Sequence, residues 1–177
     1  WTKLKEVLSY NLPLNICKAN NQITTMFGDG TISFNDIKIG TEMCEELWAP
    51  NSPNTDLGLQ GVHIICNSSA SHHQLKKLQY RTDLIKNSTA KNGGIYIYSN
   101  LIGCDGNRLY FDGSSLICCN GKFLKQCDQF SMQKVQVSSA TINISEIDIY
   151  RASIKCRGVQ SSNIKPYPEI KVDEFLS

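Results

Sequence analysis

Cys44 is the residue whose surroundings could carry out covalent chemistry. The segment IGTEMCEELW (39–48) places this cysteine where an apolar, strand-like run ends, close to three carboxylates and a tryptophan. Strand ends are where α/β proteins place reactive groups. A cysteine there could be a nucleophile if a nearby cation stabilised its thiolate. It could equally be one more buried thiol, because cysteine is among the most buried residue types, and spacing alone does not decide between the two.

A family resemblance gives Cys44 a role. It is carried in order by the segments FGDGTISF, IGTEMCEELWAP, NSSASHHQLKK, RTDLI, KNGGIYIYSN, GCDGNRLYFDG and PYPEIKVD. Together they cover nearly all of residues 27–177 and resemble the amidase domain of eukaryotic-type glutamine-dependent NAD synthetases. The resemblance implies an α/β fold of the nitrilase type, a four-layer αββα sandwich with mixed sheets that is incomplete in this chain. It also implies an enzyme that hydrolyses glutamine.

The resemblance implies a mechanism as well. Cys44 would attack the side-chain amide of glutamine, form a glutamyl thioester and release ammonia. The backbone N–H of Glu45 would help to stabilise the oxyanion, and its carboxylate would line the substrate pocket. Ser71 and Lys77 would lie near the amino-acid head group of glutamine. The glutamate and lysine of the family's catalytic triad lie upstream of the cysteine, in segments that this sequence lacks, so the 177 residues alone are expected to be inactive.

Each of these residues also has a plainer interpretation. Glu45 could be a solvated acidic residue that follows a strand. Ser71 has a glutamine three residues later, the spacing of a capping box, so its first predicted role is to cap a helix. Lys77 would then be an exposed helix lysine. His72 and His73 would point to different sides of that helix without a third ligand at suitable spacing, so no metal site is expected.

Hydrophobic periodicity predicts the elements that position Cys44. Apolar residues switch from even positions (32 and 34) to odd positions (37 and 39) across Asn35–Asp36, which predicts two strands joined by a tight turn. The run GVHIIC (61–66) predicts a strand covered on both faces, and residues 67–70 are expected to leave the sheet as a loop. A helix is predicted from Ser71 to the glycine pair at 93–94.

Further strands are predicted beyond this helix. They are IYIYSN (95–100), RLYFDGSSLICC (108–119) and KFLKQC (122–127) around a turn at Asn120–Gly121, followed by VQVSSATINI (135–144). Ser145 is then expected to cap a short helix. A strand, helix, strand and hairpin order with apolar strands favours an α/β layered protein with a mixed sheet.

Composition excludes several classes of protein. A chain of 177 residues suits one domain, and its net charge of +2 comes from interspersed acidic and basic residues without a basic stripe. No apolar run reaches about 18 residues. Neither nucleic acid nor a membrane is therefore an expected partner. The eight cysteines lack C-x-x-C spacing and several lie in apolar runs, which favours reduced thiols in a cytoplasmic protein.

The resemblance divides the chain and names partners. Residues 1–165 would be part of the amidase domain, which itself needs no cofactor. Residues 166–177 would be a linker towards an absent synthetase domain that uses ATP and magnesium to amidate nicotinate adenine dinucleotide. Assembly as a homo-oligomer is expected. Two alternatives stay open: another amidase of the nitrilase superfamily that acts on a different amide or nitrile, and a noncatalytic fragment used for assembly.

Overall fold

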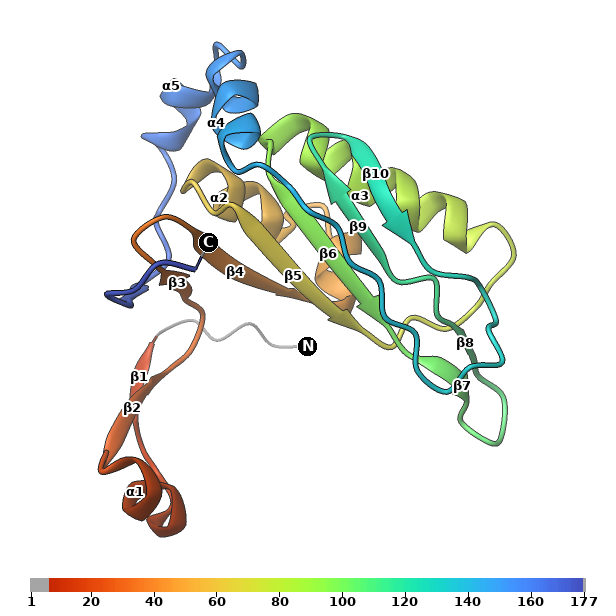
Figure 1. The fold of residues 1–177 in the computed structure, drawn as a ribbon, viewed down its shortest axis with the longest axis horizontal. Coiled ribbons are helices and arrows are strands. Elements are labelled where there is room, and N and C mark those ends of the chain that lie inside the picture. Colours follow the sequence, from red (N-terminus) through yellow and green to blue (C-terminus); the bar gives the residue numbers. More distant parts are fainter. Residues whose placement is uncertain (1–6, 177) are drawn as a thin grey trace.

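A seven-stranded mixed β-sheet forms the centre of the computed structural model, which describes residues 7–176 (Figure 1). Its strand order is β10-β9-β6-β5-β4-β3-β11. The strands β4, β5 and β6 run parallel in the middle. On one side β3 is antiparallel to β4 and parallel to β11, and on the other side β9 is antiparallel to both β6 and β10. The bounds are β3 (Thr31–Ser33), β4 (Lys38–Met43), β5 (Ile64–Ser69), β6 (Ile95–Asn100), β9 (Leu116–Cys119), β10 (Lys122–Gln126) and β11 (Glu169–Lys171).

Two helices, α2 (Pro53–Leu59) and α3 (Lys77–Asn92), cover one face of this sheet. The main core lies beneath them and contains Leu57, Ile85, Tyr96, Tyr98 and Leu116. The opposite face carries a smaller core, in which Ile147 of α4 (Ser145–Ala152) packs on strand residues. A short helix, α5 (Arg157–Ser161), follows. The described residues thus supply one sheet and its helical layer, two of the four layers that the resemblance implies.

Two smaller sheets lie outside the central one. In the first, β1 (Leu8–Asn11) and β2 (Thr24–Phe27) flank α1 (Leu14–Asn20), and Figure 1 shows this segment standing away from the main sheet. In the second, β7 (Ile102–Cys104) and β8 (Tyr110–Asp112) form a hairpin beyond the end of β6. No helix among residues 7–176 is long and apolar enough to cross a bilayer.

Both predicted tight turns are confirmed. The first joins β3 to β4, where the Phe34 N–H donates to the Ile37 carbonyl at 2.9 Å. The second joins β9 to β10, where Asn120 and Gly121 both have positive φ, at 48° and 80°. Asparagine and glycine tolerate this left-handed conformation, which a two-residue hairpin turn requires.

Several predicted boundaries and one predicted strand are wrong, and the strand predicted over residues 108–119 is divided into β8 and β9, which belong to different sheets. Strand β5 runs on to Ser69 instead of ending at position 66, because its last residues still pair with β6. The strand predicted at 135–144 is absent: Ile142 and Ile144 pack on the small core, whereas Val135 and Val137 are exposed. Ser145 begins α4 without capping it, and its N–H instead donates to Asn143 Oδ1 at 3.1 Å.

The segment predicted as a linker contributes to the sheet. Within residues 166–177, β11 pairs in parallel with β3 at the sheet edge, and Tyr167 exchanges two hydrogen bonds with the Gln60 side chain, at 2.8 and 2.9 Å. The role of this segment as a linker stays a prediction.

His63 and Arg151 form hydrogen bonds to the backbone where the parallel strands begin. The Arg151 guanidinium donates to the carbonyls of Gly61 at 3.2 Å and Gly93 at 3.1 Å, and burial together with the charge of Arg157 lowers its pKa to about 10. His63 Nδ1 accepts the Lys38 N–H at 3.0 Å. Burial lowers the pKa of His63, and the charge of Arg151 lowers it further, against an opposing effect of Asp148.

A matched pair of glycine substitutions tests the β9–β10 turn. Gly106 and Gly121 have nearly the same φ, at 83° and 80°, but a Cβ at Gly106 meets nothing within 4 Å, whereas one at Gly121 lies 2.9 Å from the Ala90 Cβ. Gly106→Ala should lower the free energy of unfolding by about 1–2 kcal/mol through backbone strain alone. Gly121→Ala should cost at least about 1 kcal/mol more through overpacking. Urea unfolding measures both, and equal losses would contradict this contact.

A pH titration of stability tests the His63 contact. Because the folded-state pKa of His63 is lowered, the unfolded chain binds a proton more readily than the folded one. This contribution to stability is present above about pH 6.5, the unfolded pKa, and is lost as pH falls from there towards the folded pKa. In His63→Asn, whose amide oxygen can still accept the Lys38 N–H, unfolding free energies between pH 7.5 and 5.5 should fall less than in the wild type. If the unfolding free energies of His63→Asn and the wild type changed equally with pH, the lowered pKa of His63 would be refuted.

Candidate active site

Cys44 lies at a strained turn at the carboxyl end of β4. It follows Met43 directly and begins a short 3-10 helix, η1 (Cys44–Trp48). Its φ of +44° lies in the left-handed region, which strains any residue other than glycine. Its N–H donates to Oδ1 of Asn67, on the neighbouring strand β5, at 3.2 Å. Cys44 is partly exposed. The thiol is therefore held at the edge where parallel strands end, as predicted for a reactive group.

Three carboxylates close to Cys44 have three different environments. Glu42 is 2% exposed and accepts hydrogen bonds from Ser52, Asn54 and Tyr96. Glu45 is exposed at the second position of η1, where helical N–H groups have no partner inside the helix. The Glu46 side chain accepts the Met43 N–H at 2.8 Å. Sequence reasoning singled out Glu45 and missed that Glu42 is the buried one of the three.

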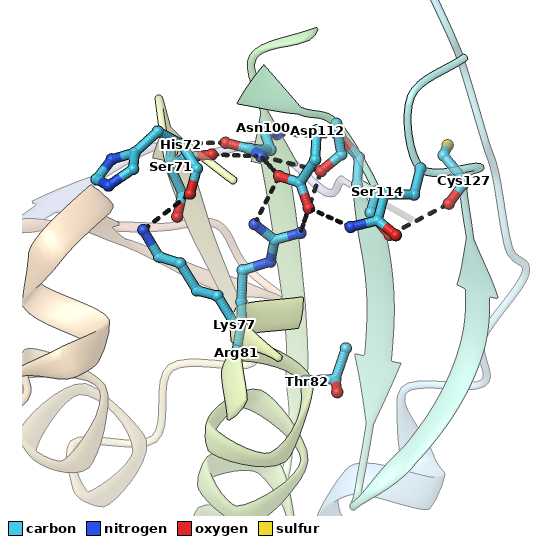
Figure 2. Close-up of polar contacts among 12 residues, drawn as sticks. Ser71, His72, Lys77, Arg81, Thr82, Asn100, Asp112, Ser114 and Cys127 are labelled. Carbon is cyan, nitrogen blue, oxygen red and sulfur yellow. Dashed lines mark hydrogen bonds and ion pairs between the residues drawn. The ribbon is translucent and has the colours of Figure 1, made fainter. Parts of the chain in front are cut away.

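Ser71 is not a helix cap, so the capping-box prediction is wrong. Helix α3 begins only at Lys77, and its N-cap is Lys76 with φ of +64°. Asn100, at the end of β6, accepts the Ser71 N–H at 2.8 Å and donates to the Ser71 carbonyl at 3.2 Å (Figure 2). These bonds hold the backbone of Ser71 on the sheet side. Ser71 is 5% exposed, and its hydroxyl has no hydrogen-bond partner among the described residues.

Lys77 is a half-buried residue and not an exposed helix lysine. Its Nζ donates to the His72 carbonyl at 3.0 Å and lies 5.5 Å from the centre of the Trp48 ring. Burial lowers the pKa of Lys77, and the charge of Arg81 lowers it further, while Asp112 and Cys44 act in the opposite direction. The structure thus brings Lys77 within electrostatic reach of Cys44.

Tyr98 adds a buried phenol to this edge. Burial raises its pKa, and the hydroxyls of Ser69 and Ser71 lie close enough to act against that rise, although none of them meets hydrogen-bond geometry with the phenol. Cys44 lies near enough that a thiolate there would raise the pKa of Tyr98 further. The candidate site therefore contains Cys44, Ser71, Lys77 and Tyr98, all at the carboxyl ends of the parallel strands or on the segment that follows them.

A buried ion pair supports this edge from below. Arg81 of α3 and Asp112 of β8 form two parallel contacts, at 3.2 and 3.1 Å, with side chains only 1% and 2% exposed (Figure 2). Asn100 and Gln129 donate to the same carboxylate, at 3.2 and 2.9 Å. Sequence reasoning missed this pair; the only signal was an arginine on the apolar face of a helix. The network fixes Asn100, which in turn holds Ser71.

No metal site is visible in residues 7–176, because no three His, Cys, Asp or Glu side chains are grouped to hold an ion. All eight cysteines carry free thiols.

Residues 14–152 match the family model for carbon-nitrogen hydrolases. The chain belongs to this family. Among its curated relatives, the glutamine-dependent NAD(+) synthetases of Bos taurus and Homo sapiens are 46% and 45% identical over all 177 residues, and that of Saccharomyces cerevisiae is 48% identical over 162. The chain spans about a quarter of the length of these relatives, 25%, 25% and 23% respectively.

Solved structures agree with this carbon-nitrogen hydrolase membership. A glutamine-dependent NAD(+) synthetase from Cytophaga hutchinsonii superposes with a TM-score of 0.58 at 26% identity, covering 73% of this chain and 19% of that one. A carbon-nitrogen hydrolase from Helicobacter pylori G27 has a TM-score of 0.62 at 18% identity, covering 77% and 50%, which shows the fold alone. The predicted α/β fold class and family resemblance are confirmed.

The Arg81–Asp112 pair yields a stability prediction. Arg81→Met leaves the Asp112 carboxylate buried without its cation, so the free energy of unfolding should fall by about 3–5 kcal/mol. Lys86→Met on the same helix is the control, because Lys86 is exposed and its replacement should change stability by no more than about 0.5 kcal/mol. Urea unfolding of both variants measures the difference. Similar losses would show that the pair contributes little.

Proposed function

We propose that this chain is the nucleophile-bearing part of the glutamine-hydrolysing domain of a glutamine-dependent NAD synthetase, with Cys44 as nucleophile. The observation that carries the proposal is the strained Cys44 turn at the carboxyl end of a parallel strand, with φ of +44° and a hydrogen bond to Asn67. Membership of the carbon-nitrogen hydrolase family and the similarity to glutamine-dependent NAD(+) synthetases over the whole chain support it.

The reaction follows from the chemistry of a thiol and a carboxamide. The Cys44 thiolate attacks the amide carbon of glutamine, and the resulting oxyanion accepts a hydrogen bond from the Glu45 N–H at the amino end of η1. Losing one such donor typically raises the barrier by about 3–4 kcal/mol. The C–N bond then breaks, a proton is delivered to the nitrogen, and ammonia leaves. Water hydrolyses the glutamyl thioester to glutamate and restores the thiol.

Two of the three carboxylates close to Cys44 are already engaged in hydrogen bonds and are poorly placed to move these protons. Glu42 is buried among several donors, and Glu46 holds the Met43 N–H. We therefore assign the general acid–base carboxylate and the catalytic lysine to other parts of a longer protein, as the family's triad implies. The 177 residues alone should have no appreciable glutaminase activity. The Glu45 carboxylate is left as a pocket residue.

Ser71 and Lys77 are the proposed contacts of the glutamine head group. The Ser71 hydroxyl is buried without a partner in the described structure, so it can bond a substrate without giving up an existing contact. Lys77 provides a positive charge for the α-carboxylate, close to Cys44. Glutamine would then be held by its head group while its side chain reaches the thiol.

The remaining parts of the proposal concern the whole protein. The ammonia would serve a synthetase domain that uses ATP and magnesium to amidate nicotinate adenine dinucleotide, reached through residues 166–177. The amidase part would need no cofactor. Homo-oligomeric assembly and a cytoplasmic location belong to the same proposal, without nucleic acid or a membrane as partner. The competing functions are an amidase for another amide or nitrile and a noncatalytic assembly unit.

The test is Cys44→Ala in the longest natural form of the protein. Glutamine-dependent formation of NAD should fall below detection, while NAD formation from added ammonia should stay within about twofold, because only the ammonia supply is lost. The matched control is Cys66→Ala, since burial raises the pKa of the Cys66 thiol on β5 and makes it a poor nucleophile. This variant should keep both activities.

Covalent labelling distinguishes the competing functions. A glutamine-mimicking diazoketone should form one adduct, on Cys44, and glutamine should protect against it. An adduct that only another amide prevents would favour a different amidase. If Cys44 stays unlabelled in the folded, longest form, the glutaminase assignment fails and the assembly function replaces it.

A further inference from the structure

We propose that Glu42, Tyr96 and Asn67 form a positioning relay that fixes the backbone of Cys44 from beneath. The relay deepens the proposed function and rests on it for its catalytic consequence. It links three strands, because Glu42 is on β4, Tyr96 on β6 and Asn67 on β5. None of the three would touch substrate.

The relay starts at a carboxylate that is buried without a cation. Glu42 is 2% exposed, and among the described residues no lysine, arginine or histidine forms an ion pair with it. Its oxygens accept hydrogen bonds from the Ser52 hydroxyl, the Asn54 amide at 2.9 and 3.2 Å, the Asn54 backbone N–H at 3.3 Å, and the Tyr96 hydroxyl. Burying a charge in this way is costly, so its position two residues before Cys44 calls for a role.

The Glu42 carboxylate fixes which groups donate and which accept along the hydrogen bonds that lead to Cys44. A carboxylate only accepts, so Tyr96 donates its proton to Glu42. The Tyr96 oxygen is then an acceptor, and Asn67 Nδ2 donates to it at 2.9 Å. This orients the amide of Asn67, whose Oδ1 accepts the Cys44 N–H at 3.2 Å and the Ser69 hydroxyl at 2.7 Å. Burial and the Glu42 charge hold the pKa of Tyr96 well above its usual range, so the phenol stays a donor.

The end of the relay meets the strained part of the chain. Cys44 has φ of +44°, a conformation that persists only where the surroundings impose it. Asn67 is 1% exposed and cannot turn its oxygen elsewhere while Tyr96 holds its nitrogen. The relay also commits the Cys44 N–H to Asn67. The backbone donor left for an oxyanion is therefore the N–H of Glu45.

A purely structural role for the same bonds makes a different prediction. If Glu42, Tyr96 and Asn67 only stabilise the core, their removal lowers stability without a specific effect on turnover. If they act through Cys44, removal lowers kcat, since a displacement of about 1 Å at a reacting atom can reduce the rate by about 100-fold. A role through Cys44 also predicts that the effects of the substitutions on kcat are not additive, because once one hydrogen bond of the relay is lost, losing a second has little further effect.

The experiment is a double-mutant cycle in the longest natural form of the protein. Tyr96→Phe and Asn67→Leu should each lower kcat for glutamine hydrolysis by about tenfold or more and leave KM within about twofold. In the Asn67→Leu background, Tyr96→Phe should change kcat by less than about twofold. Thr89→Val is the matched control, because it removes another buried hydroxyl, one that accepts the Gly121 N–H away from Cys44. It should lower stability and leave kcat unchanged.

Hydrogen–deuterium exchange tests the relay without relying on glutamine. Tyr96→Phe and Asn67→Leu should both accelerate exchange in the peptide that spans residues 42–48, and Thr89→Val should not. If the wild type hydrolyses no glutamine, the proposed function fails, and the exchange result alone supports or overturns the relay. Unchanged exchange in both variants overturns it. So do additive effects on kcat, a change confined to KM, or faster exchange with an unchanged kcat.

Discussion

The parallel pairing of β4, β5 and β6 is the constraint on which the candidate site depends. Its register places Met43 opposite Ser68, and Ser68 opposite Ser99, so the three strands end together at one edge of the sheet. Each strand must leave the sheet there, so Cys44 just after β4, Ser71 just after β5 and Asn100 at the end of β6 lie along the same edge. These residues are far apart in sequence and share this edge because the strands are parallel and in register.

Two buried polar networks keep this edge in a single arrangement. One runs from Glu42 through Tyr96 and Asn67 to the Cys44 backbone, and the other runs from Arg81 and Asp112 through Asn100 to Ser71. Apolar side chains could fill the same space at lower electrostatic cost. What apolar side chains cannot do is fix the direction of an N–H or a carbonyl. The thiol and the candidate head-group contact are thus each held from beneath by directional bonds, one network for each residue.

Sequence patterns predicted the sheet better than they predicted the site. The β3–β4 and β9–β10 turns, the central strands and the end of α3 at Gly93 followed from periodicity and turn chemistry. Ser71 misled because a capping-box spacing is local, whereas its actual partner, Asn100, is 29 residues away. The burial of Glu42 and Arg81 was missed for the same reason, since a charged residue in a strand or helix is predicted to be exposed unless its distant partners are known. The strand expected at 135–144 does not form: its alternating apolar residues include the exposed Val135 and Val137, and alternation in the sequence does not by itself supply a strand to pair with.

The sheet and helical layer described here are the part of the sandwich that positions Cys44. On the side covered by α2 and α3, Leu57, Ile85, Tyr96 and Leu116 are at most 2% exposed. The opposite face is covered mainly by α4 and the segment before it, and leaves Ile64, Ile97 and Ile117 only partly buried. In a four-layer sandwich such a face packs against a second sheet about 10 Å away. The two polar networks lie on the helical side, so the position of the Cys44 backbone is set by contacts among the residues described here, and the partly buried face opposite them takes no part in it.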